Sequence, residues 1–406
     1  MDKGEKSLIA GMPRIIGVPK ESYPGENRVA LTPETAASFI KADMEVLMEE
    51  GAGERAGYPD KRYLDKGVKI VQDRAELFKA ASVILQVRTL GANPEAGRED
   101  LERMQPGQVV IGLSEPLTSM EETGLLAEAG VSHLSMELMP RITRAQNMDS
   151  LSSMATIAGY KAVLLATEAL PRMFPMLMTA AGTLAPARVF VIGAGVAGLQ
   201  AIATAKRLGA VVHAYDVRPA VKEQVESLGA RFVELEIDGG DSEDKGGYAK
   251  AMDEEFYRKQ REMMARVLAE SDVVITTAAV PGKKAPILIT REMVHEMAPG
   301  SVVVDIAAER GGNCELTRPG ETVKEEGVTV LGPLNLPASV PYHASQMYAK
   351  NIANLLQLLD KNSGQEFDMT DEVIRETLVT RDGKIVHARI RELLGMDTLV
   401  PEGSEA

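Results

Sequence analysis

The stretch that decides the fold is Arg188-Val-Phe-Val-Ile-Gly-Ala-Gly-Val-Ala-Gly-Leu-Gln200. Its apolar first part predicts a β-strand, and its glycine-rich part predicts a tight turn into a helix that runs to about Leu208. In this spacing Gly193 permits the turn, Gly195 lets the backbone approach a pyrophosphate, and Gly198 lets the helix pack closely on the sheet. The helix N-terminus then offers free N–H groups and a positive dipole end to the phosphates. The pattern predicts a dinucleotide-binding turn. The alternative is a tight turn in a βαβ unit that binds nothing.

A second apolar run follows this helix and ends in an acidic residue. Val211–Tyr215 predicts the next strand, and Asp216 stands at its carboxyl end. A carboxylate at this place accepts hydrogen bonds from the ribose hydroxyls of NAD and repels the 2′-phosphate of NADP. Because strand, helix, second strand and acid occur in the required order, we expect NAD(H) as the cofactor.

The composition is that of an acidic globular protein. The chain has 406 residues, with 45 Lys and Arg against 59 Asp and Glu, which gives a net charge of −14. The length predicts two domains, and the acidic balance without a dense basic cluster argues against nucleic acid as a partner. Cys314 is the single cysteine, so no intrachain disulfide can form, which favours a reducing compartment. We interpret Cys314 as a packed thiol and not as a nucleophile.

The sequence predicts no membrane span and no signal peptide. The most apolar window, Ala155–Pro186, is interrupted by charged residues and prolines, and it does not reach the roughly 18 apolar residues that a span needs. Met1–Pro13 lacks the apolar core and the cleavage site of a signal peptide, so we interpret it as a disordered leader. We therefore expect a cytoplasmic chain.

Before the glycine-rich turn, apolar runs alternate with helical patterns as in a parallel α/β domain. Thr32-Pro33 predicts a helix start, with a capping hydroxyl and a proline at the first helical position. This domain has no glycine fingerprint of its own. The predicted strands are Ile15–Val18, Glu45–Met48, Lys69–Val71, Ser82–Val87, Val109–Leu113 and Val131–Glu137. The predicted helices are Pro33–Lys41, Arg62–Lys66, Arg74–Ala80 and Ser119–Ala129.

After Asp216 the same alternation continues. A glycine-rich, acidic segment, Glu236–Tyr248, is predicted to be either disordered or a lid. The later strands of this second domain are predicted at Arg231–Leu235, Asp272–Thr276, Ser301–Ile306 and Val328–Leu331.

The C-terminal part of the sequence predicts a long helix and a hairpin. From Pro341 a helix carries apolar residues on one side, and Asp382-Gly383 within Val379–Val386 is a hairpin signal. The apolar side of the helix consists of Ile352, Leu355, Leu356 and Leu359. We expect this part to return to the first domain. The predicted fold is α/β, with two Rossmann-like, doubly wound parallel-sheet domains separated by a cleft. Residues 14–150 with 342–400 form the first domain, and residues 151–341 form the NAD-binding domain.

A polar segment precedes a long helix expected from Leu151 to about Leu170. It contains Arg141, Gln146 and Asp149, an amide between two opposite charges just before the helix start. One interpretation is a capping and salt-bridge cluster at a domain hinge. The other is a polar grip on the nicotinamide carboxamide and ribose, which would hold the reactive carbon of the ring at attack distance.

The sequence shows no acid–base or metal motif. The five histidines, His133, His213, His295, His343 and His387, lie outside any motif, and no metal-ligand spacing is present. We therefore expect no metal. A hydride that passes between two pyridine rings needs no proton shuttle, because the two rings need only be held face to face.

Several longer segments resemble the alanine dehydrogenase/proton-translocating transhydrogenase superfamily. The segments that resemble the superfamily as a whole include Arg14-Ile-Ile-Gly-Val-Pro-Lys-Glu, Glu26-Asn-Arg-Val-Ala-Leu-Thr-Pro and Gly300-Ser-Val-Val-Val-Asp. The transhydrogenase branch is favoured by Pro140-Arg-Ile-Thr-Arg-Ala-Gln-Asn-Met-Asp-Ser, Asp216-Val-Arg-Pro-Ala-Val-Lys-Glu, Gly246-Gly-Tyr-Ala-Lys and Gly311-Gly-Asn-Cys-Glu. The resemblance covers about residues 14 to 390 and indicates the NAD(H)-binding alpha-1 subunits, known as domain I, of this family.

The resemblance implies an activity shared between subunits. NADH bound here would pass a hydride directly to NADP+ on a separate beta subunit, and a membrane-spanning alpha-2-type subunit would couple this transfer to proton translocation. The chain would be a homodimer, attached to the cytoplasmic face of the inner membrane through these partners. The residues implied to order the nicotinamide and to face NADP(H) are Arg141, Gln146 and Asp149. Those implied to bind NAD(H) are Arg144, Ser152, Gly193, Gly195, Val196, Gly198, Asp216, Val217, Arg218, Gly247, Tyr248, Gln260 and Ala279. Of these, Gly247, Tyr248 and Gln260 would close over NAD, and Ala279 stands where the family commonly has a bulkier aliphatic residue.

Two other functions stay open at this point. An alanine dehydrogenase of the same superfamily would need a lysine after the Ser82–Val87 strand, a histidine after the next strand and a late aspartate. This sequence has Arg88, Ser114-Glu115 and Glu309 at those places. The third possibility is an NAD-responsive binding protein without turnover, which would have no need of the Arg141, Gln146 and Asp149 cluster.

Overall fold

The computed structural model describes residues 15–234, 254–279, 282–361 and 367–397. The chain divides into two compact units. One comprises the residues up to Met154 and those from Ala338 onward, and the other comprises Ala155–Pro337. The predicted leader and the acidic segment Glu236–Tyr248 lie outside the described residues.

The first unit is built on an eight-stranded sheet with the order β17-β16-β6-β5-β4-β1-β2-β3. Strands β1 to β6 are parallel, and their spatial order, 3-2-1-4-5-6, is that of a Rossmann fold. Their bounds are β1 Ile15–Val18, β2 Glu45–Glu49, β3 Lys69–Val71, β4 Val83–Arg88, β5 Val109–Leu113 and β6 Ser132–Ser135. The helices between them are α1 Pro33–Ile40, α2 Asp60–Leu64, α3 Arg74–Ala80, α4 Ala96–Leu101 and α5 Met120–Glu128.

The C-terminal segment completes this sheet. Helix α11 (Pro341–Lys361) buries its apolar side, as predicted, and α12 (Glu372–Thr377) leads into the antiparallel hairpin of β16 (Leu378–Arg381) and β17 (Lys384–Ile385). The hairpin prediction is confirmed, because Asp382 and Gly383 have φ angles of 49° and 76°, which suit a tight turn between antiparallel strands. Strand β16 pairs antiparallel with β6, and α13 (Ala388–Leu393) follows.

The second unit repeats the same strand order around the glycine-rich turn. Its seven-stranded sheet has the order β11-β10-β9-β12-β13-β15-β14, and β14 alone runs antiparallel to its neighbour. The order reverses at β9, which is where doubly wound sheets bind ligands. The strands are β9 Arg188–Ile192, β10 Val211–Tyr215, β11 Arg231–Phe232, β12 Val273–Thr276, β13 Val302–Asp305, β14 Thr322–Glu325 and β15 Val328–Leu331.

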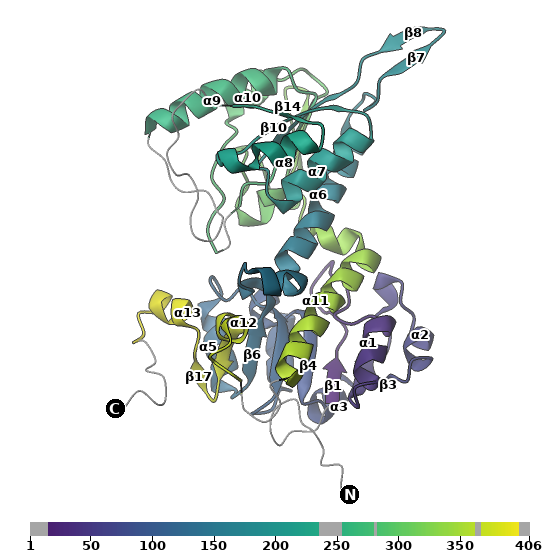
Figure 1. Ribbon diagram of the computed structural model, residues 1–406, viewed down its shortest axis with the longest axis vertical. Helices are drawn as coiled ribbons and strands as arrows, with labels where there is room; N and C mark the ends of the chain where they lie inside the picture. The colour runs from purple at the N-terminus through teal and green to yellow at the C-terminus, as the bar shows by residue number, and fades with distance from the viewer. Residues whose placement is uncertain (1–14, 235–253, 280–281, 362–366, 398–406) are drawn as a thin grey trace, which may run out of the picture. The chain divides into compact units, whose positions relative to one another are not determined.

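Both faces of this second sheet are covered, because the strands are apolar on both sides. Helices α7 (Val196–Arg207) and α8 (Lys222–Ser227) pack on one face, and α9 (Glu254–Ala269) and α10 (Arg291–His295) pack on the other (Figure 1). Alternate residues of β9 show the division: Val189 and Val191 belong to the same buried core as residues of α7 and α8, and Phe190 and Ile192 belong to the core that includes residues of α9 and α10. The fold class predicted from the sequence, an α/β chain with two Rossmann-like sheets, is therefore confirmed.

Several local predictions were wrong. Helix α1 starts as predicted, with Thr32 as the N-cap residue and Pro33 as its first residue, but the Thr32 hydroxyl does not cap it: its Oγ1 is 3.0 Å from Oγ1 of Thr35, and no side-chain cap bond forms. The helix predicted at Arg62–Lys66 begins two residues earlier, as α2. The strand predicted at Val131–Glu137 is shorter, because a 3₁₀ turn begins at Met136. Helix α4, strand β14 and the antiparallel hairpin of β7 (Leu177–Thr179) and β8 (Gly182–Leu184) were not predicted.

The long helix α6 (Ser150–Ala169) lies one residue from its predicted start and end. None of the helices in the described part of the chain is both long enough and apolar enough to cross a membrane.

A buried carboxyl group ties the segment after β1 to the end of β4. Glu21 accepts hydrogen bonds from the backbone N–H of Val87 at 2.6 Å and of Arg88 at 3.2 Å. Burial, together with the nearby charge of Glu26, raises the pKa of Glu21 from 4.5 to about 8. Between these two pH values the Glu21 carboxyl group is therefore protonated in the folded protein and ionised in the unfolded chain.

This pKa predicts that stability falls as the pH rises from about 4.5 to about 8. The titration of Glu21 lowers the free energy of unfolding by at most about 1.4 kcal/mol for each pH unit. We expect the Glu21→Gln variant to lose this slope, because glutamine fills the same space without titrating. Denaturant unfolding of both proteins across this pH range measures the difference, and parallel stability curves would contradict the prediction.

Candidate functional site

The glycine-rich turn has the geometry that its spacing predicts. Gly193 has a φ of +95°, which is the left-handed region, and its N–H donates to the carbonyl of Tyr215 at 2.8 Å. Gly195 is the N-cap residue of α7, and a Cβ added to it would meet no atom within 4 Å. A Cβ added to Gly198 would lie 1.8 Å from the carbonyl oxygen of Gly193. Gly198 is thus required by the turn itself, and the backbone at Gly195 is open to a pyrophosphate.

Asp216 is the residue directly after β10, and its carboxylate forms a hydrogen bond with the glycine-rich turn. Its Oδ2 accepts a hydrogen bond from the N–H of Ala194 at 2.7 Å. Its Oδ1 accepts from the N–H of Arg218 at 2.9 Å, and the Arg218 guanidinium contacts both oxygens. The acid predicted to bind ribose therefore also holds the glycine-rich turn in place.

A second set of polar contacts, which the sequence did not reveal, fixes the loop after β12. Asp305 is fully buried, and its carboxylate accepts from the N–H of Asn313 at 2.7 Å. The Asn313 side chain accepts from the N–H of Ala278 at 3.0 Å and donates to the carbonyl of Ala278 at 2.8 Å. Thr277, the residue before Ala278, donates a hydrogen bond from its hydroxyl to the carbonyl of Gly193 at 3.1 Å. Asp305, Asn313 and Thr277 thus connect this loop to the glycine-rich turn.

Cys314 follows Asn313 in the same network. It is 1% exposed, and burial raises the pKa of its thiol to about 11. The thiol stays protonated at neutral pH, which confirms its interpretation as a packed residue. Within the described ranges, no group of three or more His, Cys, Asp or Glu side chains could hold a metal ion.

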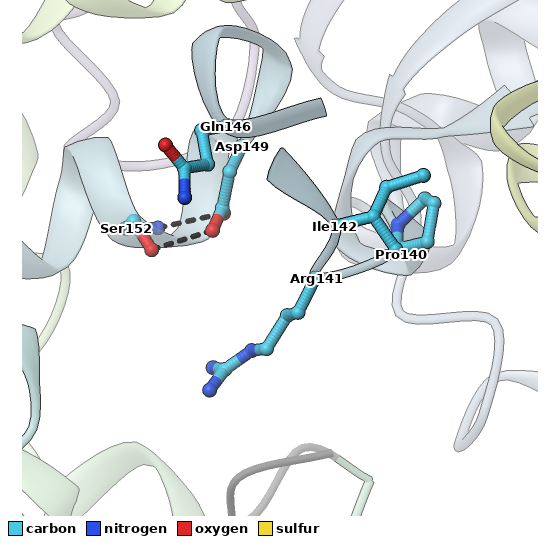
Figure 2. Close-up of a pocket in the computed structure, with 6 residues that line it drawn as sticks. All are labelled: Pro140, Arg141, Ile142, Gln146, Asp149 and Ser152. Atoms are coloured by element: carbon cyan, nitrogen blue, oxygen red, sulfur yellow. Dashed lines mark hydrogen bonds between the residues drawn. The ribbon is translucent and has the colours of Figure 1, made fainter. Parts of the chain in front are cut away.

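The first unit holds a cavity of about 350 Å³ at the polar segment before α6. It is lined by Pro140, Arg141, Ile142, Gln146, Asp149 and Ser152 (Figure 2). The three residues implied to order the nicotinamide therefore line one cavity, although the sequence separates them by up to eight positions.

Asp149 has a structural role that confirms the capping interpretation. Its carboxylate accepts from the N–H of Ser152 at 2.9 Å and from the Ser152 hydroxyl at 2.5 Å, at the first turn of α6. Figure 2 shows these two bonds, with the Gln146 amide beside them and the Arg141 guanidinium extending away from them. Capping and ligand binding are compatible here, because Gln146 and Arg141 are exposed and Asp149 is partly so.

The loop that carries these residues is held by the C-terminal segment. Arg144 forms a two-bond ion pair with Asp371 at the start of α12, at 3.0 and 2.8 Å, and this contact lowers the pKa of Asp371. The carbonyl of Asn147 accepts from the side-chain amides of Asn351 and Asn354 of α11, at 2.9 and 2.8 Å. Arg144, implied by resemblance to bind NAD(H), is not among the residues that line the cavity.

The other residues implied by resemblance are placed as follows. Val196 is the first residue of α7 and is 43% exposed. Val217 lies between Asp216 and Arg218. Ala279 follows β12 and is exposed. Gln260 is 3% exposed, and its amide donates to the Tyr215 hydroxyl at 3.0 Å. In this structure Gln260, a residue of α9, is therefore part of the buried core of the second unit. Gly247 and Tyr248 lie outside the described residues.

Two family models match the chain. "Alanine dehydrogenase/PNT, N-terminal domain" matches residues 17–158, and "Alanine dehydrogenase/PNT, C-terminal domain" matches residues 162–388. The chain is 46% identical over 375 residues to the first part of the NAD(P) transhydrogenase alpha subunit of Rhodospirillum rubrum, which covers 92% of this chain and 97% of that protein. It is 30% identical over 390 residues to the alanine dehydrogenase of Halomonas elongata, which covers 94% of this chain and 97% of that protein.

A solved structure gives the same result. The crystal structure of a transhydrogenase from Sinorhizobium meliloti superposes with a TM-score of 0.81 at 44% identity, over 92% of this chain and 100% of that chain. With both domain models matched and these relatives similar along nearly the whole length, the chain belongs to the alanine dehydrogenase/PNT family and, within it, to the branch of the NAD(P) transhydrogenase alpha subunits.

Proposed function

We propose that this chain is the NAD(H)-binding component of a proton-translocating NAD(P) transhydrogenase. NAD(H) binds at the glycine-rich turn, and the hydride of NADH passes directly to NADP+ on a partner subunit. The observation that carries the proposal is the cavity lined by Arg141, Gln146 and Asp149, in a chain that also has a complete NAD fingerprint. A protein that only sensed NAD would have no need to organise the nicotinamide end.

The residues of the cavity suit a positioning role. Bound NADH supplies the hydride, so the protein needs no acid or base at the reacting carbon. The Gln146 amide can both donate to and accept from a carboxamide, and Arg141 can donate to carbonyl and ribose oxygens. Asp149 is already oriented by Ser152. Holding the ring in a fixed position is where most of the rate enhancement of such a transfer arises.

The partners follow from the same proposal. A beta subunit binds NADP(H), and a membrane-spanning alpha-2-type subunit couples the transfer to proton movement. Through them the chain is attached to the cytoplasmic face of the inner membrane. The relatives support this division, because two of them are named as the first part of an alpha subunit, and the described residues contain one dinucleotide fingerprint.

A homodimer is also included in the proposal, and the β7–β8 hairpin supports it. The hairpin projects from the second unit (Figure 1), and the run Met173–Ala187 contains no charged residue. Met178 is 78% exposed and Met176 is 57% exposed. A two-stranded hairpin is marginally stable in water by itself, and exposed apolar patches commonly mark protein interfaces. A second copy of this acidic chain would meet least repulsion at such an uncharged surface.

Alanine dehydrogenase activity is the less favoured function. At the place where that enzyme would need a lysine, Arg88 pairs with Glu26 at 3.1 Å and lies 4.4 Å from the ring of Tyr23. At the place of its late aspartate, the Glu309 carboxylate accepts from the N–H of Asn335. Arg88 and Glu309 thus stand where alanine dehydrogenase would need a lysine and an aspartate, and each of them is bound to other residues of this protein.

The test compares the chain alone with the chain and a partner. We expect the purified chain to bind NADH, measured by calorimetry, and to show negligible alanine-dependent reduction of NAD+. Addition of an NADP(H)-binding transhydrogenase subunit should start hydride exchange between the bound nucleotides. The same subunit without NADP(H) is the control. Alanine-dependent turnover by the chain alone would contradict the proposal, and so would failure to bind NADH.

A further inference from the structure

The turn that carries Gln146 is held by the rest of the first unit on both sides of this residue. Gln146 lies in a 3₁₀ turn, Thr143–Met148, and its side chain is exposed. Two positions before it, the Arg144 guanidinium donates two hydrogen bonds to the carboxylate of Asp371, at 3.0 and 2.8 Å. One position after it, the carbonyl of Asn147 accepts from two side-chain amides of α11. Because a 3₁₀ turn has poorer hydrogen-bond geometry than an α-helix, its position depends on such outside contacts.

Asp371 is a fixed anchor for this turn. It is the N-cap residue of α12, and its Oδ1 also accepts from the backbone N–H of Val373 at 2.8 Å. Its side chain is 16% exposed. Helix α12 leads directly into β16, which pairs with β6, and β6 precedes the segment that contains the turn. The ion pair thus connects the turn to the sheet from which it extends.

We propose that Arg144 and Asp371 are positioning residues for hydride exchange, which act by holding the amide of Gln146 in place. Both terminal nitrogens of the Arg144 guanidinium bond to Asp371, in the two-bond geometry that orients an arginine most strongly. Gln146 lines the cavity, whereas Arg144 does not. This inference rests on the proposed function, since it assumes that Gln146 orders the nicotinamide. It assigns Arg144 a different role from the binding of NAD(H) that the resemblance implies.

The variant Asp371→Asn breaks the ion pair and keeps the fold. Asparagine is as good an N-cap residue as aspartate, so α12 keeps its first turn, while Arg144 loses the charge and one of its two acceptors. The Arg144 side chain is 47% exposed, and ion pairs of this kind contribute little to stability, so the melting temperature should change by a few degrees at most.

The expected effect of this variant is on the rate of exchange. A misplacement of about 1 Å at a reacting group costs on the order of a hundredfold in rate. Because the contacts of Asn147 remain, we expect a smaller loss, about tenfold in the rate of hydride exchange. NADH affinity should change by less than about twofold, because the phosphates and the adenosine bind elsewhere.

Arg144→Ala removes the same pair from its other side and should slow exchange to a similar extent. The double variant, Arg144→Ala with Asp371→Asn, should be no slower than either single variant, because residues that act through one contact have non-additive effects. Arg98→Ala is the matched control. Arg98 of α4 forms an exposed ion pair with Glu121 of α5 at 2.7 Å, and neither residue lines the cavity, so its loss should leave the rate unaltered.

Three measurements on the full-length chain separate rate, affinity and order. Single-turnover exchange with NADP(H)-loaded partner gives the rate, and calorimetric titration with NADH gives the affinity. Hydrogen–deuterium exchange of the backbone amides needs no partner. In Asp371→Asn the amides of residues 143–149 should exchange faster, and those in the middle of α6 should exchange as in the unaltered chain.

The outcomes separate this inference from the proposed function. If the unaltered chain does not exchange hydride with its partner, both are overturned. If it does, and Asp371→Asn keeps the unaltered rate or the unaltered amide exchange, the role of the pair is overturned and the proposed function stands. The same holds if Arg144→Ala loses NADH affinity, because Arg144 would then bind the nucleotide itself. Equal, non-additive losses of rate at unaltered NADH affinity, absent from Arg98→Ala, support the inference.

Discussion

Replacement of Gly195 by alanine is expected to weaken NADH binding about a hundredfold without lowering the melting temperature. A Cβ at this position meets no protein atom within 4 Å, so the fold has room for it. The same methyl group would occupy the place where the backbone at the start of α7 approaches the pyrophosphate. Loss of two charge-assisted hydrogen bonds of about 1.5 kcal/mol or more each corresponds to at least about a hundredfold in affinity. Calorimetry and a thermal melt measure the two quantities.

Two other glycines provide the comparison. Gly198→Ala should lower both affinity and stability, because its Cβ would lie 1.8 Å from the Gly193 carbonyl oxygen and the turn would have to move. Gly124→Ala, inside α5 with open space around its Cβ, should leave NADH affinity unchanged and raise stability slightly. If Gly195→Ala bound NADH like the unaltered chain, the pyrophosphate would not lie at this turn.

Replacement of Gln146 by asparagine is expected to slow hydride exchange with the partner subunit by about a hundredfold. The shorter side chain moves the amide by about the length of one bond, and a misplacement of this size at a reacting group costs on the order of a hundredfold in rate. NADH affinity should change little, because the phosphates and the adenosine bind elsewhere on the nucleotide. Single-turnover exchange with NADP(H)-loaded partner, together with NADH titration, separates the rate from the affinity.

Gln357→Asn is the matched control for this variant. Gln357 is exposed on α11 and is not among the residues that line the cavity, so the same chemical change should leave the exchange rate unaltered. An unchanged rate for Gln146→Asn would remove the proposed role of Gln146 in ordering the nicotinamide. A parallel loss of NADH affinity and rate would instead indicate that Gln146 contributes to binding in general.

The sequence predicted the elements whose patterns are set locally. Strands β9 and β10 have their predicted bounds, because buried parallel strands are continuous apolar runs and the glycines mark the turn between strand and helix. Strand β14, Thr-Val-Lys-Glu, is an exposed edge strand with charged residues and gives no such signal. The β7–β8 hairpin was missed for a related reason, because its residues face water and show no alternation.

The site was predictable where neighbours in sequence are neighbours in space. Asp149 and Ser152 illustrate this, because a helix N-terminus brings residues three apart together. The Asp305 and Asn313 contacts depend on how the segments after β12 and β13 meet at the carboxyl ends of these strands, and no spacing in the sequence encodes that meeting. The pairing of Arg144 with Asp371 spans 227 residues, and it was equally hidden.

The way the C-terminal segment completes the first sheet has a consequence for how the chain is made. The backbone N–H of His133 in β6 bonds to Thr380 in β16, which is synthesised 247 residues later. The second unit is one continuous segment, so all of its strands have left the ribosome before β16 exists. The nascent protein therefore acquires its glycine-rich turn early, whereas the loop with Arg141 and Gln146 gains its support from α11 and Asp371 only after the second unit has been synthesised. Ribosome-bound chains that stop before Asp371 would be expected to capture the cofactor yet remain unable to exchange hydride.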